Sequence, residues 1–339
     1  MAKITMQDIA DALQTSRVTV WKAFNNRDGV SQELREQILQ KAKEMGYNKY
    51  TADSPPAASK HNIVSLVVSR PDTSIFWMNI IHQIAKELSK NNIDLIYTYL
   101  PTFYSDGYTL PGSLSDGTTS GCIILNVYDL QLTKMLNDLD IPKIFLDIVP
   151  AIPVWEIRGD LFLLEGAETI RRLVSDFIEL GYRRFGFIGD INYAKTNSLR
   201  YEGFITALSE HHMEINPSCC MLLSQANHHY EEDVFSFLDN LQTMPEVFIC
   251  VNDYVAHVVN TYFASHGISV PDDVIITGYD GTAEHDSHSN MSATVLVDTT
   301  VLGKRLARQF IFRLENPVGC HEVIYIISNI IHPSPCPRR

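Results

Sequence analysis

The sequence lacks the long apolar run that a membrane-spanning helix requires. No stretch of about 18 consecutive apolar residues occurs anywhere along the chain. The N-terminus also lacks the basic segment and apolar block of a secretory leader, because it reads as a polar, capped helix. These absences argue against export and membrane insertion, and they predict a cytoplasmic protein.

Cysteine and histidine show no metal-binding or disulfide spacing. The six cysteines form no CxxC pair and no regular framework. Reduced thiols are therefore expected, and redox sensing is the weaker alternative. The histidine pairs at 211–212 and 228–229, and His285 with His288, fall in expected loops or helix ends. No metal site is predicted from them.

Nucleotide and hydrolase motifs are missing as well. The chain has no GxGxxG, no GxxxxGK[ST], and no GxSxG accompanied by suitably ordered His and Asp. We therefore predict no catalytic residue and no cofactor, and we expect a protein that is not an enzyme.

Positive charge is scarce: 27 Lys and Arg stand against 40 Asp and Glu, for a net charge of -13. Residues 1–50 depart from this balance, with eight basic against six acidic residues, a net +2 that leaves -15 for the remainder. An acidic bulk repels DNA, so any DNA binding must be local to these first fifty residues. The lack of a strongly basic stripe predicts weak nonspecific binding and dependence on specific, dimeric contacts.

The first fifty residues predict two short helices joined by a tight turn. Thr5 followed by Asp8 has the spacing of a capping box at a helix start. Ser16 can cap a second helix over residues 17–24, only two or three residues after the first helix ends. This arrangement is typical of a helix-turn-helix.

A third helix is predicted from Ser31 to Gly46. Its apolar face must cover the first two helices, because none of the three buries enough surface alone. Gly46 suits a left-handed C-terminal cap. The residues on that face are Leu34, Ile38, Ala42 and Met45.

In a helix-turn-helix the second helix enters the major groove with its N-terminal side chains toward the bases. Here that end presents Arg17, Val18 and Thr19, with Lys22 one turn further on. Arg and Lys donate to guanine, and the apolar groups contact a thymine methyl. Alternatively, Arg17 and Lys22 are ordinary solvated charges. The coincidence of cap, turn length and basic residues favours DNA contact.

The string ITMQDIADALQTSRVTVWKAFNN…VSQELREQILQKAKEMGY resembles the DNA-binding domain of the LacI/GalR transcription regulators. The resemblance implies that Arg17 and Val18 occupy positions that distinguish operators, and that Lys22 stands where a base-reading Arg is usual. Arg can donate two parallel hydrogen bonds to one base, whereas Lys presents a single ammonium group. Discrimination between bases at this position should therefore be less strict. The residues predicted to contact DNA are Thr5, Ser16, Arg17, Val18, Thr19, Lys22 and Asn25.

Residues 51–61 are predicted to be a linker, being polar and containing Pro55 and Pro56. The resemblance implies a hinge helix here, whose Leu wedges into the minor groove. The two prolines stand about where that Leu would be. We therefore expect the effector to act on DNA binding through the order of the linker and the spacing of the two heads. Whether residues 51–61 form a hinge helix stays open.

From residue 62 short apolar strands alternate with amphipathic helices, which predicts doubly wound parallel sheets. The fold class is thus α/β, with a three-helix head on residues 1–50 and a two-lobed effector-binding and dimerisation domain on residues 62–339. We expect an N-lobe of about 62–158 and 294–325, and a C-lobe of about 159–293 and 326–339. Residues 101–120 are Gly/Ser/Thr-rich where the alternation expects a helix.

The strings ELGYRRFGFIGD, SLRYEGF, FICVNDYVAH and GISVPDDVIITGYDG resemble the periplasmic-binding-protein-like effector domain of the same regulators. With the head, the resemblance covers nearly the whole chain. It is weaker at the last strand, where ISNIIHPSP lacks the usual Arg.

Ligands in doubly wound lobes sit at the carboxyl ends of strands, which makes the polar residues there the candidates. Carboxylates, an amide and a guanidinium beside aromatic faces suit a polyhydroxylated ring. The resemblance implies the same for Asp147, Arg200, Asn252 and Asp280; each one alone is also explained as a strand-end cap or surface ion pair. The predicted ligand-binding residues are Phe76, Trp77, Asp147, Arg200, Tyr230, Asn252, Asp253 and Asp280. Val297 lies where sugar-responsive members often have a polar residue, which allows a smaller or differently placed effector.

These observations predict a homodimeric repressor whose affinity for operator DNA is set by a small-molecule effector, and the effector expected is a sugar. The competing hypothesis is a small-molecule-sensing module whose head docks a protein. An enzyme built on the two-lobed fold is the weaker third alternative.

Overall fold

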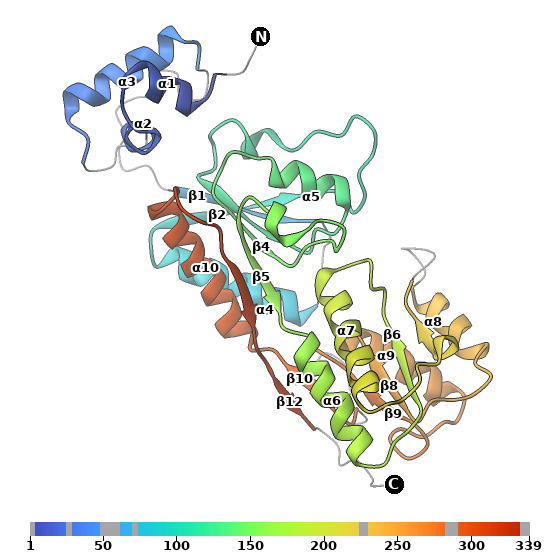
Figure 1. Cartoon of the computed structure of the whole chain (residues 1–339). Coiled ribbons are helices and arrows are strands. Elements are labelled where there is room, and N and C mark those ends of the chain that lie inside the picture. The colour runs from blue at the N-terminus through green and yellow to red at the C-terminus, as the bar shows by residue number, and fades with distance from the viewer. Residues whose placement is uncertain are drawn as a thin grey trace.

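The computed structural model describes residues 4–24, 29–47, 62–69, 74–223, 230–281 and 291–332. It consists of a helical head followed by two lobes, each built on a parallel sheet (Figure 1). The predicted fold class, an α/β chain with a helix-turn-helix head and a two-lobed domain of doubly wound sheets, is confirmed.

The head contains three helices, α1 (Met6–Ala12), α2 (Arg17–Phe24) and α3 (Gln32–Glu44). Gly46 has φ +72°, as expected for a left-handed cap. The head has its own small core, as the sequence predicted. Its buried members are Ile9, Ala10, Val20, Ala23, Phe24, Ile38, Ala42 and Tyr47.

The N-lobe is a six-stranded parallel sheet in the order β11-β5-β4-β3-β1-β2. The strands are β1 (Asn62–Val68), β2 (Ile93–Tyr99), β3 (Gly121–Leu125), β4 (Lys143–Leu146), β5 (Asp160–Leu164) and β11 (Val323–Ile326). The helices are α4 (Ile75–Ser89), α5 (Leu130–Asn137) and α10 (Thr299–Glu315).

Helices cover both faces of this sheet. Side chains alternate along β3, so that Ile123 joins the cluster under α4 and α10, whereas Ile124 joins the cluster under α5. The helices α4 and α10 approach closely at Gly303, where an added Cβ would lie 2.6 Å from the Ile80 carbonyl oxygen. Only a glycine permits this crossing.

The C-lobe is a four-stranded parallel sheet in the order β7-β6-β8-β9. Its strands are β6 (Phe185–Ile188), β7 (Cys220–Met221), β8 (Val247–Cys250) and β9 (Ile275–Thr277). Its helices are α6 (Ala167–Glu179), α7 (Lys195–Glu210), α8 (Tyr230–Asp239) and α9 (Asp253–Ser265). An added Cβ on Gly203 would lie 2.1 Å from the Ala167 carbonyl oxygen, so this glycine permits the close contact of α6 with α7.

The chain passes between the lobes at residues 165–166, 297–298 and 327–328. At the first and third passages, the Glu165 amide donates to the Ile326 carbonyl at 2.9 Å. Next to these passages, β10 (Thr294–Leu296) pairs antiparallel with β12 (Asn329–Ile331). The lobes are therefore joined by three neighbouring segments that can act as a hinge, and the second of them runs in the opposite direction to the other two.

Three expectations about the elements need correction. The predicted lobe boundary at 158–159 falls before β5, but β5 lies in the N-lobe sheet. The near-continuous apolar string EVIYIISNII suggests a single strand, but it forms β11 and β12 in two different sheets. Residues 101–120 form no α-helix and contain only the short 3-10 helix Gly112–Leu114.

Within the described ranges, every helix is either too short or too polar to cross a membrane. Two further 3-10 helices lie at Val154–Glu156 and Pro217–Cys219.

Candidate functional site

The predicted caps of the head are present. The Thr5 side chain accepts from the Asp8 amide, and the Asp8 carboxylate accepts from the Thr5 amide at 2.8 Å. Hydrogen bonds donated to this carboxylate by the Thr5 amide and the Thr5 hydroxyl hold the pKa of Asp8 below its ordinary value. The Ser16 hydroxyl accepts from the Thr19 amide at 3.0 Å. Thr5, Ser16 and Thr19 thus fix the helix starts, and their contact with DNA stays a prediction.

The start of α2 presents Arg17 on the surface, while Val20, Ala23 and Phe24 face the head core. Val18 and Lys22 are half-buried and lie one turn apart on the same helix. Arg17 pairs with Asp140 of the N-lobe, with 3.3 Å between Nη2 and Oδ1. Asn25, predicted to contact DNA, lies outside the described residues. The exposed start of α2 is the candidate DNA-contacting surface.

A second candidate site lies where strand ends of the two lobes meet. Asn126 after β3, Asp147 after β4 and Asp280 beyond β9 have φ values of 55°, 65° and 104°. Residues other than glycine adopt this left-handed region at a cost, and such strain is concentrated at functional sites. Asp147 and Asp280 were predicted here. Asn126 was missed, although it ends the string GCIILN just as Asp147 ends KIFLD.

Asp147 connects the lobes. Its carboxylate accepts from the Thr196 hydroxyl at 2.5 Å, from the Thr196 amide at 3.3 Å and from the Ile148 amide at 2.8 Å. Burial raises the pKa of Asp147, and the hydrogen bonds from Thr196 and Ile148 oppose that rise. Beside it, the Lys195 amide donates to the Ile148 carbonyl at 2.7 Å. Thr196 was not predicted from the sequence.

Arg200 lies in the second turn of α7 and is 3% exposed. Its Nη1 donates to the Val251 carbonyl, and its Nη2 lies 3.6 Å from Asp280 Oδ1. Its guanidinium stacks on the Tyr279 ring, with 3.6 Å from Cζ to the centroid. Within the described ranges, its buried Nε has no hydrogen-bond partner.

Two tyrosines complete this group. Tyr128 follows β3 and Tyr193 precedes α7, and their ring centroids are 4.5 Å apart. Burial raises the pKa of Tyr128 well above its usual range, and the Asp147 carboxylate raises it further. The Tyr128 hydroxyl therefore remains a neutral hydrogen-bonding group. Neither tyrosine was predicted from the sequence, although Tyr128 stands two positions beyond Asn126 in a strand-end loop.

Tyr230 begins α8, and its hydroxyl is buried without a hydrogen-bond partner among the described residues. Burial raises its pKa, and nearby Asp190 contributes to the rise. Asp190 follows β6, so this hydroxyl also lies near strand ends of the C-lobe. Tyr230 was predicted to stack on a ligand through its ring, which stays a prediction. The feature that the structure adds is its buried hydroxyl.

Asn252 and Asp253 have structural partners. The Asn252 side chain caps α9 by accepting from the Val255 amide at 2.9 Å. Asp253 is 2% exposed and accepts from the Thr294 hydroxyl at 2.6 Å inside the C-lobe. Asp253 therefore lies within its own lobe, and ligand contact by either residue stays a prediction.

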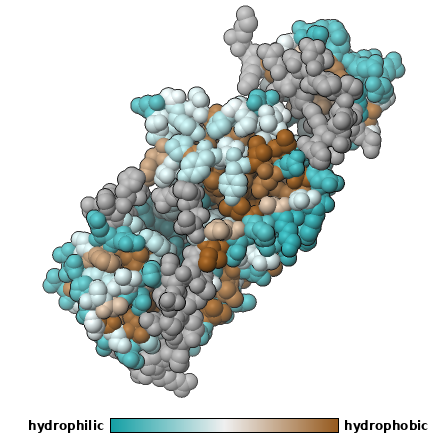
Figure 2. All heavy atoms as spheres, turned by 180° about the vertical axis from the view of Figure 1, so that it is seen from behind, coloured by the Kyte–Doolittle hydropathy of each residue, from teal (hydrophilic) through white to brown (hydrophobic). Residues whose placement is uncertain are grey.

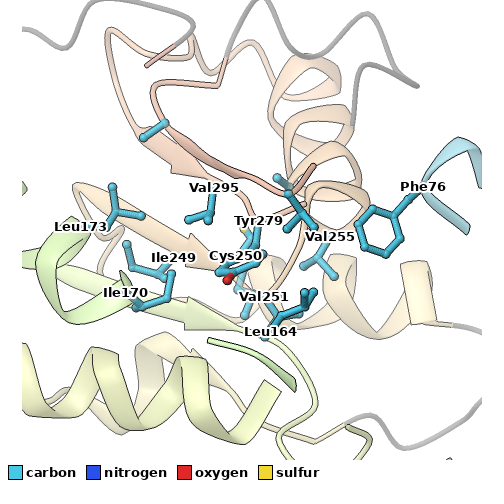
Figure 3. Packing of buried hydrophobic residues seen from close by; sticks show 14 of the residues in the cluster. Phe76, Leu164, Ile170, Leu173, Ile249, Cys250, Val251, Val255, Tyr279 and Val295 are labelled. Carbon is cyan, nitrogen blue, oxygen red and sulfur yellow. The ribbon is translucent and has the colours of Figure 1, made fainter. Parts of the chain in front are cut away.

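Phe76 and Trp77 lie in the first turn of α4 in edge-to-face contact, with ring centroids 5.3 Å apart. Phe76 is 5% exposed and belongs to the hydrophobic cluster that includes residues of both lobes. Figure 3 shows it pointing from α4 toward Val255, with Leu164 near Val251. This cluster contains residues of both lobes and joins them. We call the polar group made up of Asp147, Arg200, Tyr128, Tyr193 and Asp280 the interlobe site. Among the described residues, no group of three or more His, Cys, Asp or Glu is arranged to hold a metal ion.

Comparison with known proteins supports this architecture. Residues 174–331 match the family model described as a periplasmic binding protein-like domain. The chain is 24% identical to the HTH-type transcriptional regulator CelR of Thermobifida fusca, over 91% of this chain and 92% of that protein. It is 22% identical to the HTH-type transcriptional repressor PurR of Histophilus somni (strain 129Pt), over 96% of this chain and 97% of that protein.

Solved structures show the same fold. A complex of the transcriptional regulator CelR with cellobiose is 20% identical and has a TM-score of 0.66, covering 97% of this chain and 98% of that one. The lac repressor dimer bound to operator and the anti-inducer ONPF is 16% identical with a TM-score of 0.63, at the same coverage. The resemblance predicted from the sequence is confirmed, and the relatives named here are regulators of transcription, not enzymes.

Proposed function

We propose that this chain is a LacI-family transcription repressor whose affinity for operator DNA is controlled by a sugar bound between its two lobes. One observation carries the proposal: a single chain contains both a capped helix-turn-helix head and two lobes that meet at polar groups. Relatives of matching length are named transcriptional regulators and repressors.

The head supplies the DNA-binding half of the proposal. In this geometry α2 lies in the major groove, so Arg17 and Lys22 reach base edges while the caps hold the helix starts. The remainder of the chain is acidic and does not attract the DNA phosphates. The affinity for DNA therefore depends on the local contacts of the head.

The interlobe site supplies the sensing half. Within this site Asp280 follows a strand and the buried Arg200 Nε is a donor from α7, and the buried Tyr230 hydroxyl lies near other strand ends of the C-lobe. A regulator in complex with cellobiose and a LacI-family regulator with bound ribose share this fold. The hydroxyl groups of a polyhydroxylated ligand can donate to the acceptors and accept from the donors. Its binding would change the angle between the two lobes and hence the distance between the two heads of the dimer.

A homodimer places two heads in successive major grooves of a pseudo-palindromic operator. The exposed hydrophobic surface on α4 and the edge strand β2 supports this assembly: Ile75, Met78, Tyr97 and Tyr99 are each about half exposed, at 49%, 56%, 59% and 53%. Figure 2 shows hydrophobic residues gathered on the N-lobe near the head. We propose this surface as the dimer interface.

Sequence selection from random duplexes with the purified full chain tests the DNA-binding half. A pseudo-palindromic consensus is expected, and Lys22→Ala should weaken binding and relax preference at one position in each half-site. Lys134→Ala, on the N-lobe helix α5 and outside the head, is the matched control. If the selection enriches no DNA sequence at moderate salt, the DNA-binding proposal is contradicted and the alternative, a head that docks a protein, is favoured.

The oligomeric state is tested separately by light scattering. Met78→Asp on the proposed interface should shift the chain toward monomer, whereas Ile215→Asp, an exposed site in the C-lobe, should leave it unchanged. A wild-type monomer at micromolar concentration contradicts the dimer.

A further inference from the structure

Tyr279 and Asp280, which follow β9, contact two of the three passages between the lobes. The Tyr279 hydroxyl donates to the Glu165 carbonyl at the first passage. The Asp280 carbonyl accepts from the Val297 amide at 3.2 Å at the second passage. The Glu165 amide in turn donates to the Ile326 carbonyl beside the third passage. Hydrogen bonds that start from this dipeptide therefore connect all three segments of the hinge.

Arg200 packs against the same dipeptide. Its guanidinium lies over the Tyr279 ring, with 3.6 Å from Cζ to the centroid, and its Nη2 lies 3.6 Å from Asp280 Oδ1. Its stem lies beside the first passage, because a Cβ added to Gly166 would be 2.7 Å from Arg200 Cγ. Since protein interiors are close-packed, a displacement of the guanidinium has to move the Tyr279 ring.

Both side chains are buried, and each has the chemistry for its part. The Arg200 side chain is 4% exposed, and within the described ranges its Nε is without a hydrogen-bond partner. An acceptor on a ligand in the interlobe site satisfies this donor and pulls on the guanidinium. Tyr279 is 0% exposed and belongs to the hydrophobic cluster that includes residues of both lobes (Figure 3). Burial raises the pKa of Tyr279, so its hydroxyl keeps the proton that it donates to Glu165.

We propose that Tyr279 is a positioning residue that couples the interlobe site to the hinge. A ligand that engages Arg200 shifts the guanidinium against the tyrosine ring, and the hydroxyl transmits this shift to Glu165 and hence to the three passages. The inference rests on the proposed role of the interlobe site in effector binding. A tyrosine that only filled the core would not connect Arg200 to the hinge.

Tyr279→Phe, which removes the hydroxyl and keeps the ring, tests the connection to the hinge. Amide hydrogen exchange is measured on the full chain without ligand or DNA. Loss of one hydrogen bond of ordinary net strength changes a local opening equilibrium about five-fold, so the Glu165 and Val297 amides should exchange about five-fold faster. Tyr262→Phe is the matched control, because the Tyr262 hydroxyl donates to Asp239 Oδ1 at 2.6 Å inside the C-lobe. It should leave both amides at the wild-type rate.

A second substitution tests the connection to Arg200. Arg200→Met keeps the stem beside Gly166 and removes the guanidinium, so it should also speed exchange at the Glu165 amide in the wild-type background. In the Tyr279→Phe background it should add little, because both substitutions break the same connection. Should Arg200→Met fail to fold, Arg200→Lys takes its place, since lysine lacks the planar group that lies over the Tyr279 ring.

Two outcomes overturn the inference. One is that Tyr279→Phe leaves either the Glu165 or the Val297 amide at the wild-type rate. The other is that the effects of the Tyr279 and Arg200 substitutions simply add, as they would for two independent contributions to the core. Failure of the proposed function is seen separately, as a chain that selects no operator DNA.

Discussion

Thr196 donates two hydrogen bonds to Asp147 across the junction of the lobes, one from its hydroxyl at 2.5 Å and one from its amide at 3.3 Å. Asp147 follows a strand of the N-lobe, and Thr196 is in the first turn of α7 in the C-lobe. The chain thus satisfies Asp147 without a ligand, and this pair holds the lobes together.

Thr196→Val should weaken that closure, because it removes the hydroxyl and leaves a buried carboxylate short of a donor. Loss of one buried hydrogen bond to a charged group costs about 1–3 kcal/mol. We expect a lower free energy of unfolding in urea and weaker effector binding. Thr261→Val, whose hydroxyl bonds to the His257 carbonyl on the surface of α9, should change little. Equal effects from the two variants would contradict an interlobe role for Thr196.

Asp147→Asn should change how stability depends on pH. Burial raises the Asp147 pKa above the ordinary value of 3.8, so the folded state holds the proton more tightly than the unfolded state. The stability from this proton is present below pH 3.8 and is lost as pH rises through the folded pKa. Asparagine cannot lose it, so the variant should gain stability relative to wild type as pH rises through this window.

Asp116→Asn is a control for which the change of stability with pH should have the opposite sign. Hydrogen bonds from Thr118 lower the pKa of Asp116, so its contribution is present above the ordinary value of 3.8 and is lost as pH falls. The variant should lose stability relative to wild type as pH rises. Urea titrations at several pH values measure both differences, and parallel curves for Asp147→Asn and wild type would refute the assigned shift.

Local signals predicted the head almost residue by residue. Thr5, Ser16, Ser31 and Gly46 each mark a helix end through hydrogen bonds or backbone preferences within a few residues, so one short window contains the information. The paired strands and helices of the lobes were predicted for the same reason, from their periodicity.

The interlobe site was only partly predictable, because its membership depends on contacts between distant segments. A polar residue after an apolar run marks a strand end, which identified Asp147 and Asp280, but the same pattern also selected Asp253, which is turned into its own lobe toward Thr294. Thr196 meets Asp147 over 49 positions of sequence, and no local pattern specifies that pairing. The lobe boundary was misplaced for a similar reason: β5 pairs with both β4 and β11, and β11 lies near the end of the chain.

Arg313→Met should destabilise the N-lobe strongly. Arg313 and Asp160 form a buried ion pair with 2.6 Å between Nη2 and Oδ1, and their side chains are 4% and 0% exposed. Removing the cation leaves a buried carboxylate uncompensated, which costs about 3–5 kcal/mol. Arg158→Met breaks a pair with Asp138 whose side chains are 71% and 70% exposed, so the loss should be about 1 kcal/mol or less. Chemical unfolding of both variants decides whether burial determines the difference.

Asp140→Asn should strengthen operator binding at low salt. Arg17 pairs with Asp140 at 3.3 Å in the DNA-free chain, and the same guanidinium cannot contact Asp140 and a base together. The side chains are 52% and 61% exposed, so the pair is worth about 1 kcal/mol at most and the gain should not exceed about five-fold. It should disappear at high salt and in an Arg17→Ala background, while Asp138→Asn should give no gain. An equal gain with Arg17 removed would show that Asp140 acts only by repelling DNA phosphates, without holding the head.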